Sequence, residues 1–244
     1  MMAYIGRLRE RSLWLQNNDD INAPASAPEG FMLGEPDLSK EDGVYEFSLA
    51  SQTRLSLPGL ARERIVDMAL ANGSDWLLFW DADMVYPLDA ILRLIRHNKP
   101  VVGTLGFTSR APILPCIYKI REAFDPIQKV PTYDSETVVD YPRNQLFSND
   151  GIGGELAFGA GISLYNMNVF RQIPKPWFNS TGCGEDWFFC VRCQIHNIPR
   201  YLDSSINPRH KVHDPQWADE AAYDAAMESD PEIYERVRNR EPIW

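Results

Sequence analysis

The hydrophobic and polar positions of the chain change their spacing several times between residues 58 and 104. From Pro58 to Gly73 apolar residues recur at helical spacing, and Trp76 to Trp80 then form a continuous apolar run. Such a run is typical of a strand buried on both faces of a parallel sheet. An apolar stripe over residues 88–95 predicts a second helix, and Val101 begins another strand. Strand, helix and strand in this order form a βαβ unit, which predicts an α/β fold with a mostly parallel sheet flanked by helices.

The remaining segments are less regular. Residues 111–150 contain five prolines and predict a loop-like region, whereas residues 17–43 have no usable periodicity and predict a mobile arm. Further strands are predicted at Ala3–Ile5, Val44–Leu49, Leu156–Tyr165 and Arg200–Asp203, and further helices at Glu185–His196, Trp217–Met227 and Glu232–Arg240. We therefore expect an N-terminal segment (1–43), one catalytic domain (44–215) and a C-terminal helical tail (216–244).

Length and composition limit the class of protein. The chain has 244 residues, of which 44% are apolar, enough for a substantial core. No run reaches the roughly 18–20 apolar residues of a membrane span, and the charged N-terminus is unlike a secretory signal. These features predict a soluble cytoplasmic protein with reduced cysteines. The net charge of −10 disfavours a large nucleic-acid footprint, although seven acidic residues fall within residues 17–43.

Two carboxylates, Asp81 and Asp83, directly follow the apolar run at Trp76–Trp80. Ligands of open α/β sheets bind beyond the carboxyl ends of the strands. Two neighbouring carboxylates repel each other unless a cation neutralises them, and their hard oxygen ligands suit Mg²⁺ or Mn²⁺. A metal held in this way can bind a diphosphate. The alternative is a pair of exposed loop acids, one of which caps the following helix.

The segment WLLFWDADM resembles the DxD region of GT-A glycosyltransferases of the family-2-like group, which use nucleotide sugars. Four more segments are similar to that family in the same order: Ala61-Arg62-Glu63, Phe158-Gly159-Ala160-Gly161, Pro176-Trp177-Phe178 with Gly184-Glu185-Asp186, and Arg200 to His210. The resemblance covers residues 44–213 and implies a Rossmann-like GT-A fold. The first strand of the family and its nucleotide-contacting loop have no clear counterpart here.

The resemblance and the chemistry of sugar transfer together assign roles to these residues. A metal ion would stabilise the charge that develops on the departing nucleoside diphosphate. The metal ligands would be Asp83, Asp81 and His210, with His213 as the alternative histidine. The donor would contact Arg62, Asp81, Arg110 and Gly161, and a UDP-sugar is the default donor.

Asp186, together with Glu185, is the candidate catalytic carboxylate at the start of a helix. A carboxylate on a rigid element can take the proton of an attacking hydroxyl, which predicts a single displacement with inversion. Both acids also favour a helix N-terminus electrostatically. Trp177, Phe178 and Trp187 could form a sugar-stacking wall or belong to the core.

Two other classes of protein remain open. Asp81-Ala82-Asp83-Met84-Val85 also fits the DxDx[TV] pattern of haloacid-dehalogenase-like phosphotransferases, with Asp81 as the nucleophile. Cys183, Cys190, Cys193 and His196 could instead form a structural zinc site. For a glycosyltransferase, the acceptor would be a glycan hydroxyl or, in a phage-infected bacterial cell, a hydroxymethylated DNA base.

Overall fold

The computed structural model describes residues 2–8, 45–51, 58–124, 131–159, 161–179, 184–213 and 216–243. The predicted mobile arm lies outside these residues. The helices are α1 (Pro58–Ala71), α2 (Ala90–His97), α3 (Asn149–Ile152), α4 (Met167–Gln172), α5 (Glu185–Ile195), α6 (Glu220–Ser229) and α7 (Pro231–Arg238). The strands are β1 (Met2–Leu8), β2 (Tyr45–Ser51), β3 (Trp76–Trp80), β4 (Met84–Val85), β5 (Val101–Thr104), β6 (Ile117–Phe124), β7 (Pro131–Thr137), β8 (Leu146–Phe147), β9 (Glu155–Phe158), β10 (Ile162–Asn166), β11 (Tyr201–Asp203), β12 (Arg209–His213) and β13 (Gln216–Ala218).

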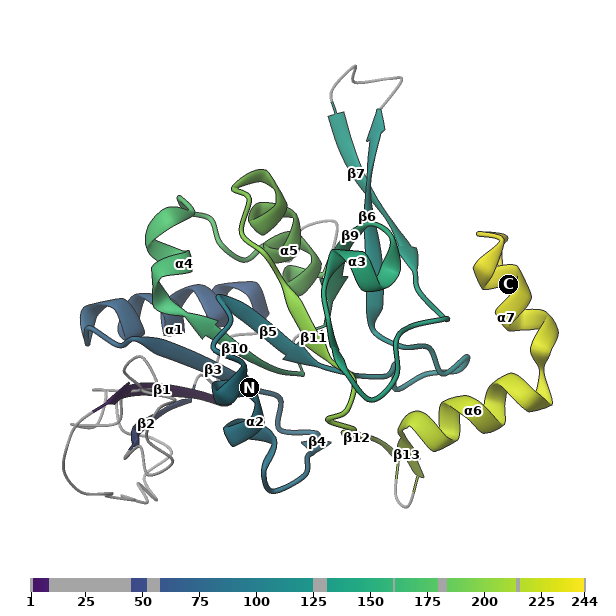
Figure 1. Cartoon of the computed structure of the whole chain (residues 1–244), viewed down its shortest axis with the longest axis horizontal. Helices are drawn as coiled ribbons and strands as arrows, with labels where there is room; N and C mark the ends of the chain where they lie inside the picture. The colour runs from purple at the N-terminus through teal and green to yellow at the C-terminus, as the bar shows by residue number, and fades with distance from the viewer. Residues whose placement is uncertain are drawn as a thin grey trace.

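The main sheet is mixed and mostly antiparallel, in the order β2-β1-β3-β10-β5-β11-β8 (Figure 1). The α/β class is confirmed, but the expected mostly parallel sheet is wrong, because among these strands only β5 and β11 pair in parallel. Both β3 and β5 pair antiparallel with β10, so they run in the same direction, as a βαβ unit requires. They are not neighbours, however, because β10 lies between them.

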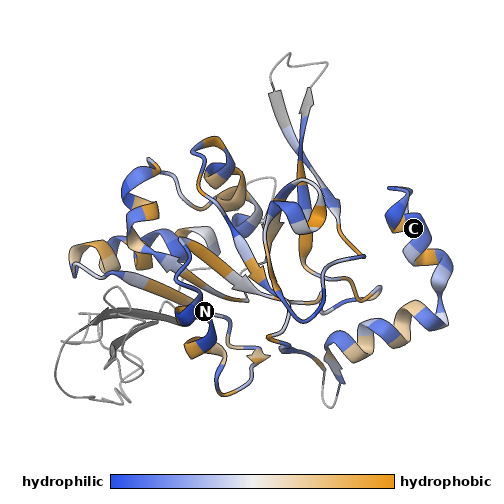
Figure 2. Ribbon diagram, viewed as in Figure 1, coloured by the Kyte–Doolittle hydropathy of each residue, from blue (hydrophilic) through white to orange (hydrophobic). Residues whose placement is uncertain are grey.

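Helices cover both faces of this sheet. Side chains of β3 alternate between the faces: Leu77 and Phe79 belong to the core cluster that includes residues of α1, α4 and α5. Trp76 and Leu78 belong to a second cluster, with Leu94 of α2. Figure 2 shows hydrophobic residues concentrated in the central strands between these layers. The two cores explain why β3 is apolar at every position.

Two three-stranded sheets complete the fold, in the orders β7-β6-β9 and β13-β12-β4. The expectation that residues 111–150 are loop-like is wrong, because they contain the hairpin β6–β7, the strand β8 and the start of α3. Two prolines of this region are compatible with the strands: Pro131 begins β7, and Pro115 forms an isolated bridge with Phe107. Prolines at strand ends do not interrupt a ladder.

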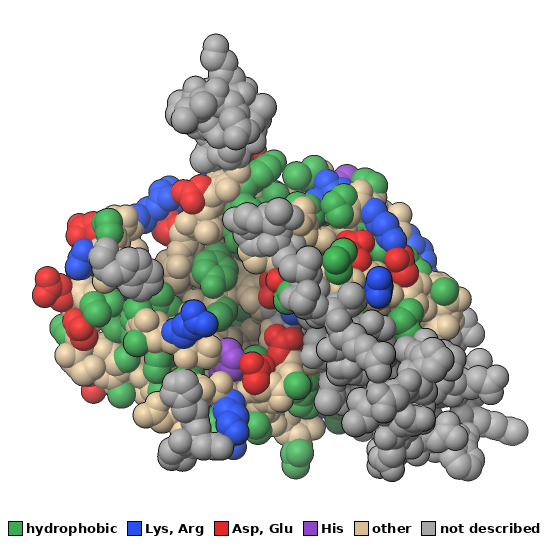
Figure 3. All heavy atoms as spheres, turned by 180° about the vertical axis from the view of Figure 1, so that it is seen from behind, with side chains coloured by type: hydrophobic (Ala, Val, Ile, Leu, Met, Phe, Trp, Pro, Cys, Tyr) green, Lys and Arg blue, Asp and Glu red, His purple; other side chains and the backbone are tan. Residues whose placement is uncertain are grey.

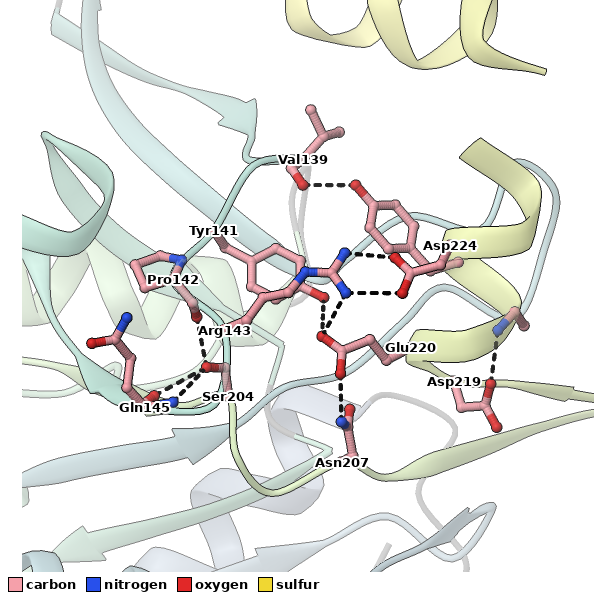
Figure 4. A network of polar contacts seen from close by, with 12 residues as sticks. Val139, Tyr141, Pro142, Arg143, Gln145, Ser204, Asn207, Asp219, Glu220 and Asp224 are labelled. Atoms are coloured by element: carbon pink, nitrogen blue, oxygen red, sulfur yellow. Dashed lines mark hydrogen bonds and ion pairs between the residues drawn. The ribbon is translucent and has the colours of Figure 1, made fainter. Parts of the chain in front are cut away.

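The C-terminal helical tail is present, although Trp217 belongs to strand β13 rather than to a helix. Figure 4 shows how polar contacts hold α6 against the domain. The Glu220 carboxylate accepts hydrogen bonds from the Tyr141 hydroxyl at 2.8 Å and from the Asn207 amide at 2.6 Å. Asp224 binds the guanidinium of Arg143 through two hydrogen bonds of 2.6 and 2.9 Å.

The expected divisions after residues 43 and 215 stay predictions. Strands from both flanking segments join sheets of the central segment, since β1 pairs with β3 and β13 pairs with β12. Among the residues that the structure describes, no helix combines the length and the apolar character that a membrane span requires.

Candidate functional site

The two carboxylates of the DxD segment lie in a tight turn at the carboxyl end of β3. The turn is held by backbone hydrogen bonds, because the Asp81 N–H donates to the Gly161 carbonyl at 2.8 Å and the Met84 N–H donates to the Asp81 carbonyl at 3.3 Å. Strand β4 then begins at Met84 and pairs with β12. This arrangement places Asp81 and Asp83 at the predicted edge of the main sheet.

Gly161 allows this turn to approach β10 closely. A Cβ atom at Gly161 would lie 2.4 Å from the Met84 sulfur and 2.8 Å from the Tyr86 hydroxyl, closer than real Cβ contacts. The glycine therefore serves the packing of the DxD turn. Its predicted contact with a donor stays a prediction.

Asp83 meets His210, which strand β12 carries to the same turn. The Asp83 Oδ2 lies 3.3 Å from the His210 Nε2, and the Lys211 N–H donates to the Asp83 carbonyl at 2.9 Å. The Nδ1 of His210 lies 2.8 Å from the Phe107 carbonyl oxygen. A carbonyl oxygen only accepts, so Nδ1 carries the hydrogen and a neutral His210 presents the Nε2 lone pair to Asp83.

Two electron-rich atoms face each other at this point. The contact is favourable only when a cation lies between or beside them, either a proton on Nε2 or a metal ion bound by both side chains. An imidazole whose second nitrogen donates to a backbone carbonyl is the usual arrangement of a metal-binding histidine. The side chain of Asp83 is 61% exposed, so a ligand can reach it from solvent. The side chain of His213 lies outside the described residues.

Arg62 is buried and gathers three carboxylates. Its guanidinium lies 3.6 Å from Asp81, 3.3 Å from Glu185 and 3.3 Å from Asp186, although only 2% of the side chain is exposed. It also packs over the Phe79 ring, 4.9 Å from the centroid. Arg62 thus joins α1, the end of β3 and the start of α5. A direct contact with a donor phosphate stays a prediction.

Asp81 retains a proton more readily than an ordinary aspartate. Burial raises its pKa to about 6; the Arg62 charge opposes this rise, and the charges of Asp186 and Asp83 add to it. One guanidinium among three carboxylates leaves a net negative site, so an added cation would stabilise it. Of the three predicted metal ligands, Asp83 and His210 meet as a pair, and Asp81 is oriented toward Arg62.

Asp186 lies in the first turn of α5 and lines a cavity of about 560 Å³. Phe158 at the end of β9 and Gly159 directly after it line the same cavity. The neighbouring acid, Glu185, is more enclosed: 16% of its side chain is exposed, compared with 23% for Asp186. Asp186 is therefore the better placed of the two acids for a group that enters this cavity.

Glu63, which the sequence placed in a motif segment without a role of its own, connects two of these segments. Its carboxylate accepts hydrogen bonds from the backbone N–H groups of Trp177 and Phe178, the second at 2.6 Å. Glu63 therefore holds the Pro176-Trp177-Phe178 segment against α1. Its neighbour Arg62 holds the Glu185-Asp186 segment in the same way. Neighbouring side chains of one helix carry out both tasks.

Trp177 and Phe178 occupy the core, which was the alternative to a sugar-stacking wall. Trp177 and Phe178 are 4% and 3% exposed and belong to the core, where Phe178 stacks on Phe189 at 4.9 Å. Only Trp187 of the three lines the cavity, where Tyr118 and Tyr133 of the β6–β7 hairpin join it. The strand-forming residues Ile117, Tyr118 and Ile120 of β6 and Tyr133 of β7 were the signal that could have identified this hairpin.

Arg110 lines a different cavity from the one beside Asp186. It lines a cavity of about 890 Å³ together with Trp217 and Val212. Trp217 also packs under the guanidinium of Arg209, 5.0 Å from the ring centroid. The predicted contact of Arg110 with a donor stays a prediction.

A zinc site and a complete metal cage are both missing from the part of the chain that the structure describes. Within it, no group of three or more His, Cys, Asp or Glu side chains is placed to hold a metal ion. Cys190 and Cys193 are buried in α5, where burial raises the pKa of both thiols, and Cys183 lies outside the described residues. A metal at Asp83 and His210 would need oxygen ligands from a bound substrate or from water.

On the face shown in Figure 3, acidic side chains gather near a histidine beside a hollow in the surface.

The sequence matches no protein-family model and no curated protein. The crystal structure of A197 from STIV matches with a TM-score of 0.44 and 16% sequence identity, over 70% of this chain and 76% of that chain. A likeness this distant carries no functional conclusion.

Proposed function

We propose that the protein is a metal-dependent glycosyltransferase, which moves a sugar from a nucleoside diphosphate sugar to a hydroxyl acceptor. The facing pair of Asp83 and His210 carries this proposal. Its atoms, 3.3 Å apart, are both electron-rich when His210 is neutral, and the Nδ1 hydrogen is already donated to Phe107. This pair fits Mn²⁺ or Mg²⁺ with the remaining positions filled by diphosphate and water oxygens.

The position of the pair supports a diphosphate as the ligand. Asp83 is exposed at the carboxyl end of β3, where ligands of α/β sheets bind. A bound metal would stabilise the negative charge that develops on the leaving nucleoside diphosphate. Asp81, held by Arg62 beside the pair, adds negative charge that increases the attraction for a divalent cation.

Asp186 is the proposed general base. The acceptor hydroxyl attacks the anomeric carbon, its proton passes to the Asp186 carboxylate, and the bond from that carbon to the diphosphate oxygen breaks. Arg62 holds Asp186 at 3.3 Å, which restricts the orientation of the carboxylate toward the cavity that it lines. One displacement of this kind inverts the anomeric centre. The proposed acceptor is a hydroxyl of a glycan or of a hydroxymethylated DNA base.

The test is a donor screen with the full chain. UDP-, GDP- and dTDP-sugars are incubated with and without Mn²⁺, and the nucleoside diphosphate released is measured. We expect metal-dependent release from one donor, lost with chelator and in Asp83→Asn but kept in Asp89→Asn, which changes an exposed acid of the same loop region. Equal release in chelator overturns the proposal. Hydrolysis of a simple phosphate ester that Asp81→Asn abolishes would instead support a phosphotransferase.

A further inference from the structure

The cavity beside Asp186 has walls from three separate parts of the chain. The hairpin β6–β7, the end of β9 and the start of α5 enclose a volume of about 560 Å³. Sites for small ligands commonly measure roughly 300–1,000 Å³. The cavity is therefore large enough for a ligand beyond the atoms that react at Asp186.

Aromatic side chains dominate the apolar part of its wall. Tyr118, Tyr133 and Trp187 all line the cavity, and all three pack against a buried cluster that includes Ile120 and Cys190. This packing supports the rings from behind and limits their motion. Rigid rings with a polar atom at one edge suit a ligand that has an apolar face and polar substituents.

One polar atom of this wall is unsatisfied. The indole Nε1 of Trp187 is buried and has no hydrogen-bond partner among the residues described. A buried donor without an acceptor costs roughly 1–3 kcal/mol. Because this atom is closed to solvent, a ligand hydroxyl could accept its hydrogen only after the indole ring turns toward the cavity.

The charged residues of the wall are all acidic. Asp134 and Asp186 line the cavity, and no lysine or arginine does so among the described residues. Their carboxylates accept hydrogen bonds, so they suit the hydroxyl groups of a sugar. Asp134 pairs with Arg240 and Asp186 pairs with Arg62, so the charges of both carboxylates are partly compensated. Nucleic-acid binding depends on cationic contacts with phosphates, and the described wall of the cavity offers no lysine or arginine for them.

From this combination we infer that the cavity binds a neutral saccharide, which stacks on Tyr118, Tyr133 and Trp187 and presents a hydroxyl to Asp186. The inference rests on the proposed function and narrows its acceptor to a carbohydrate rather than a DNA base. A pyranose has C–H groups on its faces for the aromatic rings and hydroxyl groups at its edge for the two carboxylates. A flipped DNA base would bring phosphates to a cavity whose described wall contains no lysine or arginine.

Binding is tested first, without donor. Methyl glucoside, methyl galactoside, methyl xyloside, maltose and cellobiose are titrated into the full chain, and binding is followed by saturation-transfer NMR and tryptophan fluorescence. A single-stranded oligonucleotide with hydroxymethylcytosine is titrated in parallel. We expect at least one saccharide to bind and the oligonucleotide not to bind at 0.15 M salt.

Variants assign the binding to this cavity. In Tyr133→Ala the affinity should fall by at least about tenfold, whereas Tyr133→Phe, which keeps the ring, should stay within about threefold. Tyr201→Ala is the control, because Tyr201 is also half-buried but packs against Lys99 outside the cavity. Circular dichroism checks that each variant is folded. Saccharide binding that Tyr133→Ala leaves unchanged overturns the inference, as does the absence of binding by every saccharide.

Donor turnover then separates this inference from the proposed function. Faster release of nucleoside diphosphate with the bound saccharide supports both. Release that only the oligonucleotide accelerates overturns the inference and leaves the glycosyltransferase intact. Saccharide binding in the cavity with no turnover of any donor supports the ligand class but overturns the proposed function.

Discussion

Asp83 and His210 are 127 positions apart in the chain, yet the Asp83 Oδ2 lies 3.3 Å from the His210 Nε2. Pairing of β4 with β12 creates this contact, because His210 is the direct partner of Met84 in the ladder. The hydrogen on Nδ1 is donated to the Phe107 carbonyl, so the Nε2 is the nitrogen available to a cation.

Removing either member of the pair should weaken metal binding. We expect Asp83→Asn and His210→Ala each to lower the Mn²⁺ affinity on the order of 100-fold, because each removes one of two protein ligands. Electron paramagnetic resonance titration of free Mn²⁺ measures this affinity. Asp89→Asn is the control and should bind as the wild type does. Unchanged affinity in both test variants would exclude a metal at this pair.

Asp186→Asn should separate donor binding from transfer. The substitution keeps the size of the side chain but removes the proton acceptor, so transfer should fall on the order of 100-fold or more while donor affinity stays within about threefold. Single-turnover kinetics and donor titration measure the two quantities. Glu232→Gln controls for the electrostatic effect on a helix N-terminus, since Glu232 is an exposed acid in the first turn of α7. Normal transfer in Asp186→Asn would remove this residue from the mechanism.

Arg62→Met should destabilise the fold strongly. Without the guanidinium, Asp81, Glu185 and Asp186 lose their common counter-charge, and breaking a buried ion pair costs roughly 3–5 kcal/mol of unfolding free energy. Urea unfolding measures the loss. Arg64→Met, an exposed position of the same helix, should stay within about 0.5 kcal/mol of wild type.

The pH dependence of the loss in Arg62→Met identifies its cause. The pKa of Asp81 is about 6 with Arg62 present and rises further when that opposing charge is removed. Protonation of Asp81 as the pH falls then removes one of the uncompensated charges. The loss of unfolding free energy in Arg62→Met, relative to wild type, should therefore become smaller as the pH falls from 7 to 5. A deficit of constant size would mean that packing over Phe79 and not charge accounts for the loss.

Asp203 should make stability depend on acidic pH. Burial opposes ionisation of this carboxyl, but hydrogen bonds from His97 and Ser205 outweigh burial and lower its pKa to about 2. Since the folded pKa lies below the unfolded one, the stabilisation is complete above about pH 4 and is lost as the pH falls toward 2. We expect Asp203→Asn to lower the free energy of unfolding by about 2 kcal/mol at pH 7 and by roughly half as much at pH 3.

Urea unfolding at the two pH values measures the contribution of Asp203. Asp89→Asn serves as the control, because Asp89 is exposed and its side chain makes no capping hydrogen bond. A deficit equal at pH 7 and pH 3 would show that the substitution acts through shape rather than through charge.

The helices α1, α2 and α5 and the strand β3 were predictable because their signals are local. Helical spacing of apolar residues between a proline and a glycine predicts α1 regardless of the tertiary structure. A five-residue apolar run predicts that β3 is buried on both faces. The position of Asp81 and Asp83 at the end of β3 followed from the same run. These features depend on residues only a few positions apart.

Strand direction and strand neighbours could not be predicted in the same way. A buried strand is apolar whether its neighbours are parallel or antiparallel, so β3 and β5 gave no sign that β10 lies between them. The hairpin β6–β7 was missed because charged residues interrupt its apolar positions and prolines surround it. The aromatic residues of the cavity were missed with it.

The amino-acid sequence alone determined the α/β class, the main helices and the carboxylate pair at the strand end, because local hydrophobic spacing decides which segments become helices or strands. Tertiary structure decided that His210 meets Asp83, that Arg62 joins three carboxylates, and that two tyrosines of a hairpin complete the cavity beside Asp186. His210 and Asp83, for example, are 127 positions apart in the chain. A local sequence pattern does not show which distant strands will pair.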